Sequence, residues 1–142
     1  SHTRARNCAQ TQAQDRLHEM FIVLHKDSYV RPHKHKTKTE SFLILEGKAD
    51  AVFFDESGKV TDVISMGDYA SGLQFYYRMS EPVYHTLILK TPYLVFKEVG
   101  EGPYDKADAA FPDWAPAAND SDEGRAYLKT VANTASTFLL KK

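Results

Sequence analysis

The sequence has almost no cysteine, no excess of either charge and no long apolar run. Among 142 residues there is one cysteine, Cys8, which excludes an internal disulfide and a multi-cysteine zinc site within one chain. Eighteen basic and 19 acidic residues give a net charge of −1, which argues against a broad nucleic-acid or membrane-binding surface. No apolar run approaches the roughly 20 residues of a membrane span, and no signal-peptide pattern is present. We therefore expect a cytoplasmic protein.

The length and composition predict one domain in three parts. A chain of 142 residues, 42% of them apolar, is long enough to bury a sizeable core without disulfides. Residues 1–16 are polar without a clear period, which indicates an arm or an irregular first element. Residues 17–105 have strand composition and predict a barrel, and residues 106–142 predict a loop followed by a helix.

Short β-rich runs dominate the middle of the chain. Seven or so strands separated by turn residues are typical of an antiparallel sandwich or barrel, and the clearest runs are 20–24, 41–46, 49–54, 60–66, 83–89 and 93–99. In the tail, Ser121 is a good helix N-cap ahead of Asp122 and Glu123. An apolar stripe at helical spacing then follows, made of Leu128, Val131, Ala135 and Phe138.

The histidines suggest a metal site. His33 and His35 lie two residues apart, so on a strand both side chains point to the same face, and Glu40 opens the next strand. With His85 from a distant strand, these residues make a ligand set for one divalent transition metal: Fe, Mn, Ni, Co or Zn. The alternative is a solvated basic loop, because lysines surround the histidine pair. His18 and His25 are read as ordinary surface or core-edge residues.

Residues beside the histidines are candidates for binding a substrate. By strand alternation, Tyr29 and Arg31 share the face of His33, and Lys38 shares the parity of Glu40. The guanidinium of Arg31 is suited to a carboxylate or phosphate, which predicts an anionic ligand. The alternative is that Arg31 and Lys38 are solvated charges at the rim.

Three other groups have a weaker signal. Glu98 is expected to be an exposed strand residue, with a role beside the metal as the alternative. Arg4 and Arg6 could reach over the mouth of a cavity, although nothing in the sequence fixes them there.

The spacing of His33, His35, Glu40 and Gly47 resembles the first motif of the cupin superfamily. Gly47 would form the tight turn between two strands of that motif. The second cupin motif is matched by Gly67 and His85, but Pro82 and Leu89 stand where that motif has Gly and Asn. The resemblance implies an all-β fold, the cupin double-stranded β-helix or jelly-roll barrel, with the predicted helix at its C-terminal end.

Longer stretches are similar to the WbuC-type cupins, over roughly residues 4–130. They are residues 28–35, 38–42, 53–58, 96–105 and 114–116. This resemblance implies a metalloprotein associated with surface-polysaccharide synthesis, without assigning a reaction.

These features predict a metal-dependent enzyme, an isomerase or an oxygenase, that acts on a small anionic or sugar-derived substrate. The alternative is a protein that binds or senses such a ligand through its metal without turnover. We expect a small-molecule ligand as the partner and neither nucleic acid nor membrane. Aromatic-rich runs such as Phe75-Tyr76-Tyr77 could cover a barrel edge, so we also expect a homodimer.

Overall fold

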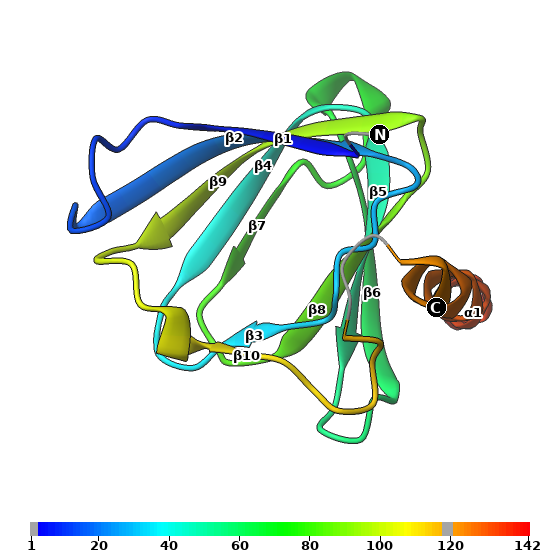
Figure 1. The fold of residues 1–142 in the computed structure, drawn as a ribbon. Coiled ribbons are helices and arrows are strands. Elements are labelled where there is room, and N and C mark those ends of the chain that lie inside the picture. Colours follow the sequence, from blue (N-terminus) through cyan, green and yellow to red (C-terminus); the bar gives the residue numbers. More distant parts are fainter. Residues whose placement is uncertain (1–2, 118–120) are drawn as a thin grey trace.

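The fold is known from a computed structural model, which describes residues 3–117 and 121–142. Strands are the main regular structure of the described chain, and one long helix, α1 (Asp122–Leu140), follows near the C-terminus (Figure 1). Two short 3-10 helices are η1 (Tyr69–Ser71) and η2 (Lys106–Asp108). The strands are β1 (Arg4–Cys8), β2 (Leu17–His25), β3 (Lys34–His35), β4 (Glu40–Glu46), β5 (Lys48–Phe54), β6 (Val60–Gly67), β7 (Tyr76–Met79), β8 (Tyr84–Leu89), β9 (Tyr93–Glu101) and β10 (Ala109–Ala110).

The strands form two antiparallel layers that face each other. The first layer is a five-stranded sheet in the order β1-β2-β9-β4-β7. The second contains β6-β5-β8 and the short pair β10-β3. A β-bridge between His33 and His85 joins these two parts, so the second layer runs continuously from β10 to β6. The expected all-β architecture with a C-terminal helix is confirmed.

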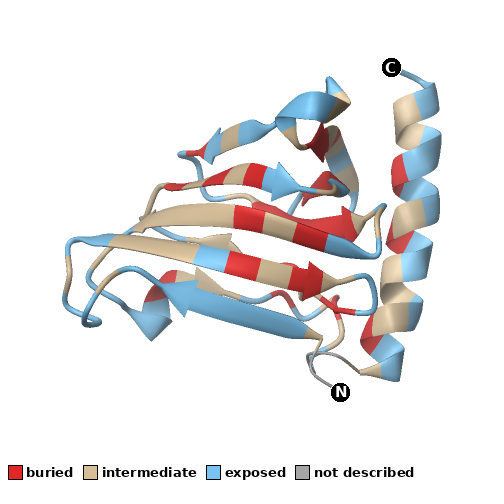
Figure 2. Ribbon diagram, turned by 90° about the horizontal axis from the view of Figure 1, so that it is seen from above, coloured by how far each residue is buried: buried red, intermediate tan, exposed pale blue. Residues whose placement is uncertain are grey.

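The main core lies between the two layers. Strand β5 shows the alternation that builds it, because Ala49, Ala51 and Phe53 pack into this core while Val52 and Phe54 face the other way. That outer face is covered by α1, whose Val131 and Ala135 are buried against it (Figure 2). The two faces of the second layer are therefore both apolar.

Helix α1 begins as its sequence predicts. The Ser121 side chain accepts a hydrogen bond from the backbone N–H of Gly124, and Asp122 and Glu123 occupy the first turn. Gly124 is required there because a Cβ at this position would lie 2.2 Å from the Tyr29 ring. Among the described residues, no helix is both long and apolar enough to cross a membrane.

Three strands were not predicted, namely β1, β7 and the two-residue β10. Residues 4–8, expected to be part of an irregular arm, form the edge strand β1, which pairs with β2 and is exposed along its whole length. Its sequence lacks apolar alternation because its inner face borders a cavity instead of the packed core. Strand β7 forms the other edge of the same sheet and was also missed, because Tyr-Tyr-Arg-Met shows no clean alternation.

Candidate metal centre and cavity

A cavity of about 1030 Å³ opens between the two layers of the barrel. Its walls come from both sheets, from η2 and from the segment before β2. All four predicted metal ligands, His33, His35, Glu40 and His85, line this cavity. The structure therefore brings together residues that are up to 52 positions apart in the chain, from 33 to 85.

His33 and His85 are held together by their own backbones. The His33 N–H donates to the His85 carbonyl at 3.2 Å, and the His85 N–H donates to the His33 carbonyl at 3.0 Å. This antiparallel bridge places the two side chains on the same face, with ring centroids 4.5 Å apart. Backbone pairing with His33 therefore places His85, the predicted ligand from a distant strand, at the site.

His35 and Glu40 meet across the short link between β3 and β4. Glu40 is buried, and its Oε2 lies 2.6 Å from the His35 Nε2. The His35 ring is also close to His33, with a centroid separation of 5.6 Å. Two imidazoles and a carboxylate thus share one wall of the cavity, as the His-x-His and Glu spacing predicts.

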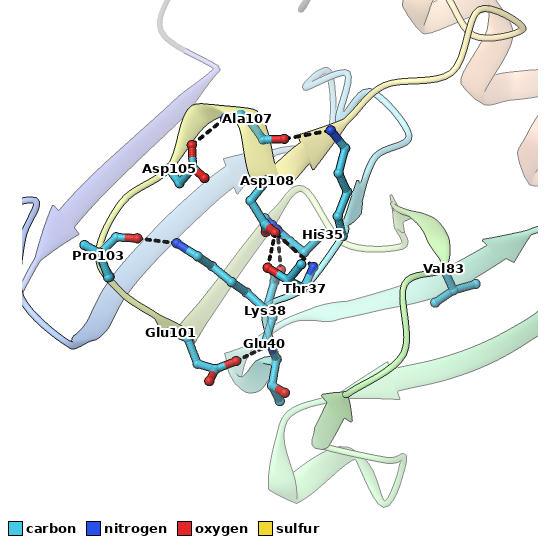
Figure 3. A network of polar contacts seen from close by, with 12 residues as sticks. His35, Thr37, Lys38, Glu40, Val83, Glu101, Pro103, Asp105, Ala107 and Asp108 are labelled. Atoms are coloured by element: carbon cyan, nitrogen blue, oxygen red, sulfur yellow. Dashed lines mark hydrogen bonds and ion pairs between the residues drawn. The ribbon is translucent and has the colours of Figure 1, made fainter.

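Each of the three histidines has an acceptor on its Nδ1. The His33 Nδ1 lies 3.0 Å from the Arg31 carbonyl, and the His85 Nδ1 lies 3.0 Å from the Val83 carbonyl. The His35 Nδ1 lies 3.2 Å from Asp108 Oδ2 (Figure 3). A carbonyl or carboxylate at this position accepts a hydrogen bond from Nδ1–H, which leaves the Nε2 of His33 and His85 available as a ligand, whereas the Nε2 of His35 faces Glu40.

Asp108 is anchored as firmly as the ligands themselves. It is buried, and its second oxygen accepts hydrogen bonds from the Thr37 backbone N–H at 2.9 Å and the Thr37 hydroxyl at 2.7 Å (Figure 3). Burial raises the pKa of Asp108, but the Thr37 and His35 contacts outweigh it, so the net shift is downward. Asp108 therefore stays a carboxylate and fixes the orientation of the His35 ring.

Burial and the neighbouring charges shift the pKa values of the titratable groups of the site in different directions. Burial lowers the pKa of His33 and takes the pKa of His85 down to about 4, so both rings are neutral at pH 7. Burial acts to raise the pKa of Glu40, but the His35 hydrogen bond and the nearby imidazoles together lower it to about 2. The hydrogen bond to Glu40 raises the pKa of His35.

Glu98, expected to be an exposed strand residue, lies on the cavity wall. It projects from β9 beside Glu40. The five residues of the edge strand β1, in contrast, are exposed. Burial, and then the negative charge of Glu40, raise the pKa of Glu98 to about 8. The site therefore contains one ionised carboxylate and one carboxyl group that keeps its proton at neutral pH.

The donor set fits a divalent transition metal. Neutral imidazole and carboxylate are ligands for such ions, and each ring has the outer acceptor that ligand histidines need. His33, His35, Glu40 and His85 would hold such an ion, and in this structure His35 bridges Asp108 and Glu40.

The ligand atoms are not yet spread to coordination distance. Two ligand atoms at about 2.1 Å from one ion lie roughly 3 Å apart, which is wider than the 2.6 Å contact between His35 and Glu40. Within residues 3–117 and 121–142, no group of three or more His, Cys, Asp or Glu side chains is arranged so that it could hold a metal ion.

Two of the predicted substrate-binding residues lie outside the cavity. Tyr29 is fully buried beneath α1, and its hydroxyl donates to the Pro116 carbonyl at 2.9 Å. The Arg31 guanidinium donates to the Pro112 carbonyl at 3.1 Å and lies over the Phe111 ring at 4.9 Å. The expected alternation fails because residues 29–32 are not a strand.

Lys38, the third of these residues, does line the cavity. Its Nζ donates to the Pro103 carbonyl, so part of its donor capacity is already used (Figure 3). Of the three predicted substrate-binding residues, Lys38 therefore lines the cavity, and Tyr29 and Arg31 do not.

The chain is similar to one protein family and to several solved structures. A family model described as a domain of unknown function (DUF6016) matches residues 1–66. No curated protein matches the chain. Protein SO0799 from Shewanella oneidensis superposes with a TM-score of 0.60 at 8% identity, over 75% of this chain and 72% of that one.

Two enzymes share the same architecture. Oxalate decarboxylase from Bacillus subtilis, which has Mn(II) centres, gives a TM-score of 0.58 at 13% identity and covers 78% of this chain. The DMSP lyase DddQ from Ruegeria pomeroyi DSS-3 gives 0.58 at 14% identity and covers 77% of it. This chain has the cupin fold. This chain covers 28% of the length of the decarboxylase chain and 51% of the length of the lyase chain.

Proposed function

We propose that this cupin is a metal-dependent enzyme that acts on a small anionic substrate in the cytoplasm. His33, His35, Glu40 and His85 would hold one divalent transition metal, and the cavity beside them would hold the substrate. Isomerisation and oxygenation are the reaction classes that we consider. The WbuC-type assignment and the link to surface-polysaccharide synthesis stay predictions from the sequence.

One observation carries this proposal. All three imidazoles have an Nδ1 partner on the outer side, at 3.0, 3.0 and 3.2 Å, while they line the same cavity as Glu40. A histidine cluster kept only for packing has no need for a separate acceptor on each Nδ1. The Asp108 contact supports the proposal most strongly, because a buried carboxylate is costly and here it faces a ligand.

The metal and the protein would divide the chemistry between them. The metal would supply a Lewis acid at the polar wall of the cavity. Glu98 carries a proton at neutral pH next to Glu40, so it can donate a hydrogen bond or a proton to a substrate oxygen at that wall. The apolar side chains around the rest of the cavity exclude water from the bound substrate.

Elemental analysis of the purified protein tests the proposal. We expect close to one divalent transition metal per chain after purification without chelator, or after reconstitution. His35→Ala should remove most of this metal. His25→Ala is the matched control, because His25 lies on β2 against Tyr93 and Asp27 and does not line the cavity. No bound metal in the reconstituted wild type would overturn the proposal.

We also propose that the protein is a homodimer. The five-stranded sheet carries large apolar side chains that are exposed, among them Phe21, Tyr76 and Tyr93. The helix covers the other sheet instead (Figure 1). Association of two copies would remove this apolar surface from water.

A further inference from the structure

Most of the cavity wall is apolar. The metal ligands and Glu98 form one polar wall, and buried or half-buried apolar side chains form much of the remainder: Met20, Ile22, Leu24, Phe42, Leu87 and Phe96. The volume of about 1030 Å³ is at the upper end of cavities that hold drug-sized ligands, roughly 300–1,000 Å³. A two-carbon acid or a free sugar would leave this apolar wall without a partner.

A sugar is also a poor chemical match to this wall. Each hydroxyl turned toward Leu24 or Phe96 would lose its hydrogen bonds to water without a replacement. A hydrocarbon group in the same place would lose nothing and would gain the hydrophobic contribution of burial. The wall therefore favours a ligand with an apolar body.

The cavity also offers one well-placed cation. Two cations on its wall are already engaged, since Lys38 donates to the Pro103 carbonyl and Arg4 to the Tyr29 carbonyl. Arg6 and Lys106 also line the cavity, and within the described ranges 3–117 and 121–142 neither side chain has a hydrogen bond or an ion pair. Cavity-lining alone therefore does not separate these two residues.

The sheet register favours Arg6 over Lys106. Arg6 pairs with Ile22, which pairs with Phe96, and both partners point into the barrel. Residues directly opposite each other on neighbouring strands share a face, so Arg6 is on the inner face as well. Its positive charge also acts on Glu98, two residues from Phe96, and favours the ionised form of that carboxyl group. Arg6 thus lies on the edge strand β1, directly beside the apolar residues of β2 on the cavity wall.

We propose that the ligand of this cavity is an amphipathic carboxylate, with its carboxylate beside Arg6 and its hydrocarbon body along the apolar wall. The planar guanidinium matches the two oxygens of a carboxylate. That the polar wall holds a metal rests on the proposed function. The apolar contacts of the ligand do not involve the metal.

Calorimetric titration with acetate, butanoate, hexanoate and octanoate tests the apolar wall. Burial of one methylene contributes ~0.8 kcal/mol, so the affinity should rise about fourfold for each methylene that the wall covers. The titrations are done with metal-loaded and with chelator-treated protein, and the increment should be the same in both. Val30→Thr, an isosteric change in the wall, should reduce the increment.

Arg6→Ala tests the position of the carboxylate. We expect it to weaken all four carboxylates at least tenfold, to leave the increment per methylene unchanged and to leave the affinity for 1-hexanol unchanged. Lys106→Ala is the matched control, since it removes another cation from the same cavity. Equal losses in the two variants would show that a general positive field holds the anion, which overturns the role of Arg6.

The outcomes separate this inference from the proposed function. A flat affinity from acetate to octanoate in protein that binds metal would overturn the amphipathic ligand and leave the metal site intact. A methylene increment in protein that never binds metal would support the amphipathic ligand and overturn the metal-dependent function.

Discussion

Asp108→Asn should weaken metal binding although residue 108 would not touch the metal. In the structure Asp108 Oδ1 accepts both Thr37 hydrogen bonds, and Oδ2 faces the His35 Nδ1 at 3.2 Å. An asparagine that keeps its oxygen toward Thr37 would present its NH₂ group to His35. Two donors would then face each other, so the imidazole would have to move its proton to Nε2 or rotate.

The size of the effect follows from that conflict. Loss of an outer hydrogen-bond partner of a ligand histidine typically lowers metal affinity by about 10- to 100-fold, or about 1.4–2.7 kcal/mol. Asp108 is buried and touches His35 directly, so we expect a loss within this range. His33 and His85 keep their carbonyl partners and would retain part of the affinity.

Competition between the protein and a chromophoric chelator for Zn²⁺ measures this loss. Asp105→Asn is the matched control, because Asp105 lies in the same turn and accepts from the Ala107 N–H without touching His35. Thermal unfolding of both chelated variants checks that the fold is retained. An Asp108→Asn affinity equal to that of Asp105→Asn would refute the assignment of Asp108 as the group that orients His35.

Three further predictions concern the fold and the assembly. Gly47→Ala should cost about 2–3 kcal/mol in chemical denaturation, because Gly47 has φ +94° and a Cβ would lie 2.5 Å from the Tyr93 carbonyl; Gly72→Ala, at φ +73° with open space around it, should cost only about 1 kcal/mol. At a free metal concentration 100 times the Kd, the melting temperature should be about 10 °C higher than that of the chelated protein. His35→Ala should show no such difference. Light scattering should give twice the 16.1 kDa chain mass, and a monomer mass would contradict the homodimer.

The clustering of the candidate metal ligands could be predicted from the sequence because their arrangement is mostly local. His33, His35 and Glu40 lie within eight positions, and strand alternation needs only a short regular segment to bring them to one face. His85 was harder, since its pairing with His33 is a long-range contact. The position of a histidine at the start of a β-rich run was the usable signal.

Tyr29 and Arg31 were misplaced for a local reason. The prediction extended strand alternation backward from His33 through a segment that contains Pro32, which has no backbone N–H and is buried here. Without regular pairing, Tyr29 turns under α1 and Arg31 turns toward Pro112. Alternation across a proline thus gave the wrong face.

Glu98 and Asp108 were missed for different reasons. Glu98 continues the alternation of Leu94 and Phe96, so its inward direction could have been read from β9. Asp108 reaches His35 from a turn 73 positions away, and no periodicity connects the two. Only a tertiary structure shows that this carboxylate contacts the His35 ring.

The rows of paired residues across the five-stranded sheet explain how one barrel holds both a core and a site. One row runs Arg6–Ile22–Phe96–Ile44, and the next runs Cys8–Met20–Glu98–Phe42. In each row the inner face is apolar except at one place, where Arg6 or Glu98 stands at a position that packing would fill with an apolar side chain. An ionisable group there would be costly inside a closed core, so it indicates that the barrel is open at that point. The same reasoning gives the search rule for related chains: a charged residue in a row of inward-facing apolar partners predicts the wall of a binding cavity.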